Sequence, residues 1–326
     1  MPDDAMPRTL DRTLRDARGL ASAGLIDLAT LPAIEAVAER YAIAVTPAVA
    51  ALIEAPDDAI ARQFIPDPAE LVTAPHEIED PTADAPFTPV KGIVHRYPDR
   101  ALLKPLLACP VYCRFCFRRE VVGPDGGLLT EAELDAALGW LEATPAIREV
   151  ILTGGDPLML SPRRLGALMA RLSAIPHVEI LRIHSRVPVS DPGRVTEALA
   201  AALETDRAFY LCVHANHARE FTPAAAAALR RLARVGTLLG QSVLLRGVND
   251  DAAVLEALFR AMLRHRVKPY YLHQLDPAPG TARFHVPEAE GLALLAGLRG
   301  RLSGLGQPTY VKETPGGGGK VLVGRG

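Results

Sequence analysis

The sequence has little net charge, few cysteines and no long apolar run, and each shortage excludes a class of protein. Its 326 residues carry a net charge of −2, with 49% hydrophobic and 23% charged residues. The charge balance argues against broad electrostatic binding of nucleic acid or of a membrane surface. No uninterrupted apolar run approaches the roughly 18 residues that a membrane-spanning helix needs. The composition is that of a soluble globular protein with a sizeable core.

The cysteines and the amino terminus indicate a compartment. The first residues, MPDDAMPRTL, are acidic and lack the apolar segment of a signal peptide. Three of the 4 cysteines are clustered, which is not the spacing of a secreted disulfide framework. In a cytoplasmic chain such a cluster more often binds a metal or takes part in catalysis. We therefore expect a cytoplasmic protein.

The chain changes character near residue 90. Before that point, apolar residues recur at helical spacing. The last part of this region, IPDPAELVTAPHEIEDPTADAPFTP at 65–89, is rich in proline and acidic residues and indicates an extended surface linker. We expect a helical N-terminal region and linker over residues 1–90 and a second domain over residues 91–326.

Beyond residue 100, short apolar runs alternate with amphipathic segments. Strands are expected at 101–107, 149–153, 178–184, 208–214, 242–245, 269–274 and 308–312. Helices are expected near 130–143, 161–174, 192–204, 222–235, 250–264 and 287–302. Several begin with helix-opening signals, namely Thr130 with Glu133, Ser161-Pro162, Thr222-Pro223 and Asn249-Asp250. The alternation predicts a parallel sheet with helices outside it.

Residues capable of chemistry follow every expected strand. In chain order they are Cys109, Cys113 and Cys116; Gly154, Gly155 and Asp156; Ser185 and Arg186; His214, Asn216 and His217; Arg246 and Asn249; Asp276; and Glu313 with Lys320. In a β/α barrel the carboxyl ends of the strands converge on one mouth. A doubly wound sheet would instead gather function at a single crevice. We therefore predict an α/β fold with a partial or complete parallel β/α barrel.

The segment CPVYCRFCFRRE places three cysteines on one loop, at 109, 113 and 116. Three thiolates can hold three irons of a [4Fe–4S] cluster and leave the fourth iron open to another ligand. Structural zinc normally needs four protein ligands. The remaining cysteine, Cys212, falls inside an expected strand, where a buried core role is favoured. An open cluster is therefore favoured over zinc or a redox pair.

The segment PGGGGK raises a separate possibility. A glycine run near a terminus is by default a flexible tail. A phosphate-binding loop is excluded, because it would need glycine at Thr314 and a hydroxyl residue at Val321. Glycines also let a backbone approach a cofactor closely. Lys320 could then form a Schiff base with pyridoxal phosphate.

The cysteine spacing resembles the signature of radical S-adenosylmethionine enzymes, and LTGGDP at 152–157 strengthens the resemblance. Those enzymes carry a Gly-Gly-Glu-like turn after the second strand, which contacts the methionine amino group. In that superfamily the reduced cluster cleaves S-adenosylmethionine, and the resulting 5′-deoxyadenosyl radical abstracts a substrate hydrogen. The protein's part is to place the radical beside one C–H bond.

Eight motifs, from about residue 90 to the end, resemble the lysine 2,3-aminomutase family more specifically. They are HRYPDR, CPVYCRFCFRR, GGDPL, IPHVEILRIHSRVPV, HANHARE, QSVLLRGVND, PYYLHQLD and PGGGGK. Members of that family are isomerases that also use pyridoxal phosphate. It holds the substrate's α-amino group while a hydrogen leaves Cβ and the nitrogen migrates from Cα to Cβ. The resemblance implies the same reaction and cofactors here.

The resemblance also implies a role for each matching residue. Cys109, Cys113 and Cys116 would hold the cluster, and Gly154, Gly155, Asp156, Ser185, Arg186 and Gln241 would contact S-adenosylmethionine. Lys320 would carry pyridoxal phosphate, with Arg96, Arg100 and His214 around it. Arg118 would pair with the substrate carboxylate, which suits a planar guanidinium.

The expected substrate is L-lysine. In the lysine enzymes two carboxylates receive the ε-ammonium, and their positions hold Asp276 and Glu313 here. A buried ammonium needs such charge compensation. The glutamate-using relatives are not acidic at these two places. Arginine and ornithine remain open, since both end in a cation.

One branch of the family is favoured over another. Glu313 departs from the aspartate of clostridial-type enzymes and resembles the bacterial branch that makes (R)-β-lysine for elongation factor P. The chain ends at Gly326, without the tail that carries a zinc site and subunit contacts in the clostridial type. This ending resembles the elongation-factor branch, although that branch does not always keep the full glycine run.

The resemblance implies an external electron donor of flavodoxin or ferredoxin type and leaves a homo-oligomer open. The pathway served by the product also remains open. Three alternatives stand beside the favoured function: an aminomutase for another cationic amino acid, a radical S-adenosylmethionine enzyme of another reaction, and a non-catalytic iron–sulfur or zinc protein.

Overall fold

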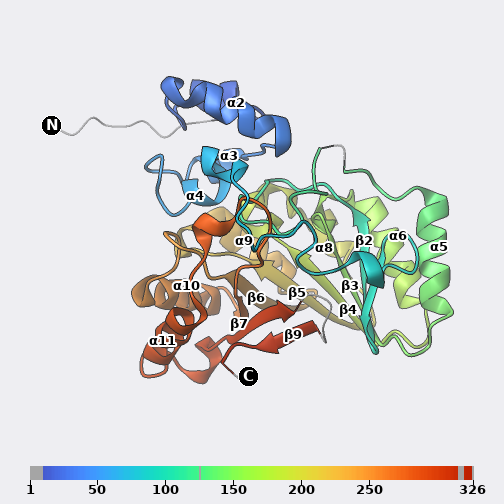
Figure 1. The fold of residues 1–326 in the computed structure, drawn as a ribbon. Coiled ribbons are helices and arrows are strands. Elements are labelled where there is room, and N and C mark those ends of the chain that lie inside the picture. Colours follow the sequence, from blue (N-terminus) through green and yellow to red (C-terminus); the bar gives the residue numbers. More distant parts are fainter. Residues whose placement is uncertain (1–9, 125, 315–318, 325–326) are drawn as a thin grey trace.

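The sheet curls into a nearly closed barrel with helices on its outside (Figure 1). The computed structural model describes residues 10–124, 126–314 and 319–324. Within these ranges nine strands lie in sequential order, from β1 to β9. No helix in the same ranges has the length and apolar character needed to cross a membrane.

Seven parallel strands form the barrel wall, and an antiparallel strand flanks each end. The parallel strands are β2 (Arg100–Leu106), β3 (Glu149–Gly154), β4 (Ile180–Ser185), β5 (Ala208–His214), β6 (Thr237–Val243), β7 (Val267–His273) and β8 (Thr309–Thr314). The antiparallel strands are β1 (Ile93–Tyr97), which pairs with β2, and β9 (Gly319–Leu322), which pairs with β8. The two ends of the sheet meet where the Lys320 backbone N–H donates to the Tyr97 hydroxyl at 2.6 Å. The predicted β/α barrel is confirmed.

Helices carry the chain from the end of each parallel strand to the start of the next. They are α5 (Glu131–Glu142), α6 (Pro162–Ser173), α7 (Val187–Ser190) with α8 (Glu197–Ala201), α9 (Pro223–Leu232), α10 (Ala252–Arg264) and α11 (Glu288–Leu298). As predicted, the hydroxyls of Thr130, Ser161 and Thr222 cap their helices by accepting backbone N–H groups. The cap of α10 was expected at Asn249-Asp250 but is Asp251. Asn249 instead accepts from the Leu245 N–H at 2.8 Å and closes the preceding loop.

The strand expected at 242–245 begins earlier than predicted. It is β6, over Thr237–Val243, so Gln241 lies inside the strand and does not open it. Gly240 interrupts the apolar pattern that would have marked this strand. It is there because α10 packs closely, and a Cβ at Gly240 would lie 2.6 Å from the Met262 sulfur. β1 and β9 were not predicted, because each is short and lacks a clear apolar alternation.

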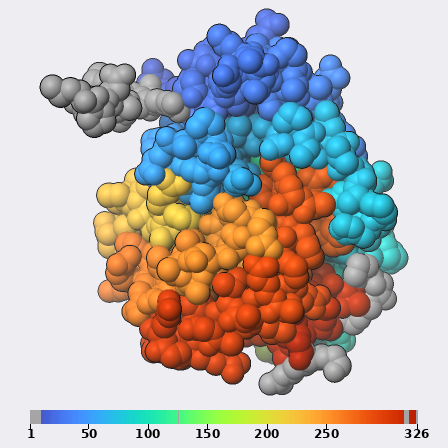
Figure 2. Space-filling view, turned by 60° about the vertical axis from the view of Figure 1, so that its left-hand side comes forward, coloured from blue at the N-terminus to red at the C-terminus, as the bar shows by residue number. Residues whose placement is uncertain are grey.

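The N-terminal residues form a helical layer over one end of the barrel (Figures 1 and 2). Its helices are α1 (Ala17–Ser22), α2 (Leu31–Arg40), α3 (Pro47–Ala50) and α4 (Ala61–Phe64). The layer has its own apolar core, which includes Leu20, Ile60 and Phe64 and extends to Val111 in the cysteine loop. This N-terminal layer therefore packs directly against the cysteine loop. The boundary at residue 90 stays a prediction.

The segment expected to be an extended surface linker is in part exposed and in part anchored in the protein interior. It contains two short 3-10 helices, η2 (Pro68–Leu71) and η3 (Ala85–Phe87). Glu70, Glu77 and Thr82 within it are buried. The prediction of a surface linker was wrong for the buried part, because Glu70 and Glu77 form long-range ion pairs and hydrogen bonds that a local composition pattern does not reveal.

Candidate active site

A cavity of ≈ 760 Å³ runs through the barrel interior. All the residues to which the sequence assigned a site role line it: Cys109, Cys113, Cys116, Gly154, Gly155, Asp156, Ser185, Arg186, Gln241, Arg96, Arg100, His214, Lys320, Arg118, Asp276 and Glu313. They come from β1, the ends and loops of the parallel strands, and β9. The barrel thus brings together groups that are far apart in the sequence, although their individual roles stay predictions.

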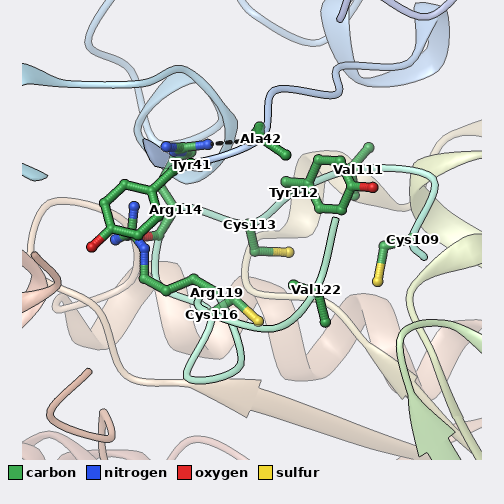
Figure 3. Close-up of a pocket in the computed structure, with 10 residues that line it drawn as sticks. All are labelled: Tyr41, Ala42, Cys109, Val111, Tyr112, Cys113, Arg114, Cys116, Arg119 and Val122. Atoms are coloured by element: carbon green, nitrogen blue, oxygen red, sulfur yellow. Dashed lines mark hydrogen bonds between the residues drawn. The ribbon is translucent and has the colours of Figure 1, made fainter. Parts of the chain in front are cut away.

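The cysteine loop leaves β2 and lies between the barrel and the N-terminal layer. Figure 3 shows the sulfur atoms of Cys109, Cys113 and Cys116 facing a common space. Burial raises the pKa of Cys116 to about 11, and the Cys113 thiolate adds to this effect. For Cys109, burial and the neighbouring Asp156, Cys116 and Cys113 all raise the pKa. Three ionised thiols at this place would therefore need a positively charged partner such as iron.

The position of the fourth cysteine bears on zinc as the alternative metal for this loop. Cys212 lies buried in β5 and is not among the residues that line the cavity. Cys212 has the buried core position that the sequence favoured.

The glycine turn after β3 packs directly on the start of the cysteine loop. Gly154 has a φ of +103°, a conformation that L side chains rarely adopt. A Cβ on Gly155 would lie 2.3 Å from the Ala108 carbonyl oxygen, next to Cys109. Only glycine fits at Gly155, because any side chain would push the turn away from the loop.

The Asp156 carboxylate joins the turn after β3 to the turn after β4. It accepts from the Ser185 hydroxyl at 2.8 Å, the Arg186 N–H at 2.7 Å and the Val187 N–H at 3.1 Å. Burial raises the pKa of this carboxyl, although the hydrogen bonds from Arg186, Ser185 and Val187 oppose the rise. Asp156 therefore positions the turns that line the cavity, in addition to lining it.

Arg186 connects the cavity to the cysteine loop. Its Nη1 donates to the Cys113 sulfur at 2.8 Å, and its Nη2 donates to Glu220 at 2.9 Å. Nη2 also bonds to the Gln63 side chain of α4 at 2.5 Å. A hydrogen bond from a guanidinium is charge-assisted and therefore among the stronger ones. The partners Gln63 and Glu220 were not predicted, because only the tertiary structure brings them to Arg186.

The β8–β9 end of the cavity is held by ion pairs. The Lys320 ammonium pairs with Glu313, which lies opposite it in the β8–β9 register. Glu313 also accepts from Arg96 Nη1 at 3.1 Å. The Arg100 guanidinium stacks on the Tyr97 ring, 3.6 Å from its centroid. Of the glycine run, Gly316–Gly318 lie outside the described residues.

Asp84 pairs with two arginines that line the cavity and with the neighbouring Lys104, and it was not predicted from the sequence. Its carboxylate lies 3.5 Å from Arg96, 3.4 Å from Lys104 and 3.3 Å from Arg118. Burial raises the pKa of Asp84, but Arg118 and Lys104 lower it more. The carboxylate is thus ionised, and it holds Arg118 beside the cavity. It was missed because it lies in the segment taken for a linker.

Several cavity groups have unmet polar capacity. Burial and the adjacent Glu313 raise the pKa of Asp276 to about 7. The Nε2 atoms of His184 and His214 are buried and have no hydrogen-bond partner among the described residues. The His214 ring lies 5.7 Å from that of Phe115, so it is near the cysteine loop. The cavity therefore offers a carboxyl that favours a cation and ring nitrogens that favour a ligand.

Comparison with known proteins agrees with this geometry. Residues 103–258 match the family model of the Radical SAM superfamily. An L-lysine 2,3-aminomutase from Acetoanaerobium sticklandii is 42% identical over 284 residues, which are 86% of this chain and 69% of that protein. The chain belongs to the lysine 2,3-aminomutase family. It is therefore an isomerase of the radical S-adenosylmethionine type.

Two further relatives have names that give different substrates. The L-lysine 2,3-aminomutase of Escherichia coli is 40% identical over 263 residues, 80% of this chain and 76% of that protein. A glutamate 2,3-aminomutase from Clostridioides difficile is 34% identical over 297 residues, 88% of this chain and 69% of that protein. The cofactors of the family are a [4Fe–4S] cluster, S-adenosylmethionine and pyridoxal phosphate.

A solved structure supports the fold alone. A radical SAM methyltransferase from Sphaerobacter thermophilus superposes with a TM-score of 0.50 at 20% identity, over 68% of each chain. At this identity the likeness concerns the barrel and not the reaction.

Proposed function

We propose that this protein converts L-lysine to β-lysine with the help of a [4Fe–4S] cluster, S-adenosylmethionine and pyridoxal phosphate. One observation carries the proposal. A single cavity has three cysteines near the N-terminal layer, a lysine on β9, and the acid pair Asp276 and Glu313 beside that lysine. These are the groups that the proposed reaction needs.

Cys109, Cys113 and Cys116 would hold the cluster, and Gly154, Gly155, Asp156, Ser185, Arg186 and Gln241 would line the place for S-adenosylmethionine. Together these cofactors supply the radical that removes a hydrogen from the substrate. The protein's own residues supply Arg186 as a donor to Cys113. The two turns joined by Asp156 keep the walls of this part rigid.

Lys320, Arg96, Arg100 and His214 would surround pyridoxal phosphate, which would supply a conjugated system able to delocalise the unpaired electron while the nitrogen migrates. Arg96 and Arg100 fit a phosphate dianion, because charge-assisted bonds from guanidinium groups are the strong ones. The Lys320 side chain is 31% exposed and reaches the cavity from β9. Glu313 pairs with the Lys320 side chain.

The substrate would lie between Arg118 and the acid pair. Arg118 would receive the substrate carboxylate, for which it must exchange or share its present partner, Asp84. Asp276 and Glu313 would receive the side-chain ammonium. Because the pKa of Asp276 is about 7, an arriving cation would favour release of its proton and complete the charge pairing.

The acid pair favours a cationic substrate over glutamate. A substrate carboxylate next to Asp276 and Glu313 would add a third negative charge in a buried place, which costs free energy. Arginine and ornithine are the alternative substrates, since each ends in a cation. The length of the side chain would decide among them.

The finer assignments rest on the sequence resemblance. We propose that the β-lysine serves elongation factor P modification, on the basis of Glu313. A flavodoxin- or ferredoxin-type protein would supply electrons in the cytoplasm, and a homo-oligomer is a further proposal. The division into residues 1–90 and 91–326 is proposed as the domain boundary.

The test is an anaerobic assay. Protein reconstituted with iron, sulfide and pyridoxal phosphate is given dithionite, S-adenosylmethionine and L-lysine, and β-lysine is sought by mass spectrometry. We expect β-lysine that depends on all the cofactors. Parallel reactions with arginine, ornithine and glutamate rank the substrates. Cleavage of S-adenosylmethionine with no change in lysine would overturn the substrate assignment and leave the radical chemistry standing.

A further inference from the structure

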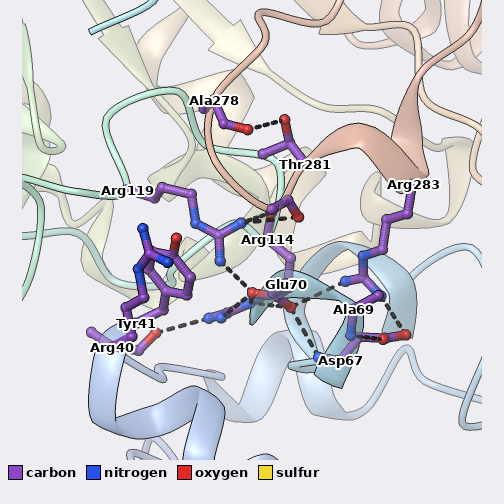
Figure 4. A network of polar contacts seen from close by, with 12 residues as sticks. Arg40, Tyr41, Asp67, Ala69, Glu70, Arg114, Arg119, Ala278, Thr281 and Arg283 are labelled. Carbon is purple, nitrogen blue, oxygen red and sulfur yellow. Dashed lines mark hydrogen bonds and ion pairs between the residues drawn. The ribbon is translucent and has the colours of Figure 1, made fainter. Parts of the chain in front are cut away.

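A buried carboxylate outside the cavity holds the cysteine loop. Glu70 lies in η2 with none of its side chain exposed. Three arginines surround it, Arg114, Arg119 and Arg283 (Figure 4). A buried carboxylate of this kind persists only when its charge is matched, so its partners show what it stabilises.

Two of the three partners belong to the cysteine loop. Arg114 lies between Cys113 and Cys116, and its Nε is 3.0 Å from each Glu70 oxygen. Arg119 follows Cys116 by three residues, and its Nη2 pairs with Glu70 Oε2. Their side chains are only 2% and 4% exposed. Glu70 thus fixes the loop on both sides of Cys116.

The remaining contacts of Arg114 strengthen the same attachment. Its backbone N–H donates to the Gln63 carbonyl at 2.8 Å, and its Nη1 donates to the Ala42 carbonyl at 2.9 Å. The Arg119 Nη1 donates to the Arg114 carbonyl at 3.0 Å. The N-terminal layer and η2 therefore determine the path of the loop between Cys113 and Cys116.

Arg283 ties the network to the connection between β7 and α11. Its Nη2 is 3.2 Å from Glu70, and its Nη1 is 2.5 Å from Asp67. Burial raises the pKa of Glu70, but Arg114, Arg119 and Arg283 lower it more, so the carboxylate is ionised. Three guanidinium groups against two carboxylates leave one positive charge in excess beside the cysteines.

We propose that Glu70 is a positioning residue for the iron–sulfur cluster: by holding Arg114 and Arg119 it sets the cysteine spacing and the local charge, and so the retention and reduction potential of the cluster. The cluster itself follows from family membership and does not require that the substrate be lysine. When a residue that supports a metal ligand is replaced, metal affinity or activity commonly falls by about 10-fold or more.

The chain offers a matched control in Glu77. It is a second buried acid of the same segment, 7% exposed. Its carboxylate accepts from the backbone N–H groups of Gly280, Thr281 and Ala282 at 2.7–3.0 Å. Within the described residues, its carboxylate makes no hydrogen bond or ion pair to the cysteine loop. Glu77→Gln should therefore affect folding without affecting the cluster.

The experiment compares Glu70→Gln, Glu70→Asp and Glu77→Gln with the wild type after anaerobic reconstitution. Iron and sulfide content, the electron paramagnetic resonance spectrum and a redox titration of the cluster are measured, together with thermal unfolding. For Glu70→Gln we expect a more positive reduction potential, because a negative charge near the cluster is lost. We also expect faster loss of iron, by about 10-fold. Glu70→Asp should restore the potential in part.

The outcomes separate this inference from the proposed function. If Glu70→Gln and Glu77→Gln lower thermal stability alike and the potential and iron retention of Glu70→Gln equal those of the wild type, Glu70 is only structural and the inference falls. A wild type that holds the cluster but forms no β-lysine overturns the proposed substrate and leaves the Glu70 comparison intact. A wild type that binds no iron overturns both.

Discussion

Glu313 and Lys320 lie opposite each other on β8 and β9, and their side chains form an ion pair inside the cavity. The pair joins the residue proposed to receive the substrate ammonium to the residue proposed to carry pyridoxal phosphate. Arg96, on β1, binds the same carboxylate at 3.1 Å. Replacing either Glu313 or Lys320 should therefore change the ion pairing of the other residue.

Lys320→Ala should remove pyridoxal binding and leave the cluster in place. The side chain is partly exposed at the barrel end, so little stability depends on it. Activity should fall on the order of 10³-fold or more, as for other residues that anchor a reacting group. Lys312→Ala is the control, since Lys312 pairs with Glu288 outside the cavity. Borohydride treatment followed by peptide mapping locates the pyridoxyl label, and a label retained in Lys320→Ala refutes the assignment.

Glu313→Gln should weaken substrate binding. Removing one partner of a buried, hydrogen-bonded charge pair costs about 2 kcal/mol or more, roughly a 30-fold rise in the KM for lysine. Glu288→Gln is the matched control, because Glu288 pairs with Lys312 at 2.7 Å and 40% of its side chain is exposed. The measurement is KM with the cluster content of each variant checked. An equal KM in wild type and Glu313→Gln would count against Glu313 as a substrate ligand.

Asp276 should make lysine binding dependent on pH. Its pKa is raised from 3.8 to about 7, whereas the substrate ammonium stays charged well above that pH. The KM for lysine should fall as the pH rises from about 6 to about 8. Asp276→Asn should have a higher KM and no such trend. Asp191→Asn is the control, because burial also raises the pKa of Asp191, which is not among the residues that line the cavity.

The same shift predicts a change in stability. The folded protein holds the Asp276 proton more tightly than the unfolded chain does. The contribution of this proton to the free energy of unfolding is therefore fully present below pH 3.8 and is lost as the pH rises through about 7. Asp276→Asn should therefore be more stable than the wild type at pH 8 and gain less at pH 5. Denaturant titrations at the two pH values measure the difference. A variant less stable than the wild type at pH 8 would contradict the shift.

Gly319→Ala should misplace Lys320. Gly319 has a φ of +86°, and a Cβ there would lie 1.9 Å from the Tyr97 hydroxyl, which accepts from the Lys320 N–H. Displacing a reacting group by about 1 Å can cost on the order of 10²-fold in rate. The control is Gly304→Ala, where a Cβ meets no atom within 4 Å and φ is not in the left-handed region. Comparable activity in both variants would show that Gly319 is not needed for placement.

Local patterns were sufficient for most of the barrel. Six of the seven parallel strands and the helix starts at Thr130, Ser161 and Thr222 follow from apolar periodicity and capping residues. The position expected for β6 was too late in the chain, because Gly240 interrupts the apolar pattern of the strand where Met262 packs against it. β1 and β9 were missed, since their pairing partners, and not their own sequences, make them strands.

The sequence by itself determined the chemistry: the spacing of Cys109, Cys113 and Cys116 and the motifs around Gly155 and Lys320 were enough to identify the family, because such motifs are short and local. Only the tertiary structure decided how these groups are held. Asp84 faces Arg96, Lys104 and Arg118, and Glu70 faces Arg114, Arg119 and Arg283, across separations of 12 to 213 residues. Ion pairs of this range leave no periodic trace in a sequence, since charge pairing depends on distance in space.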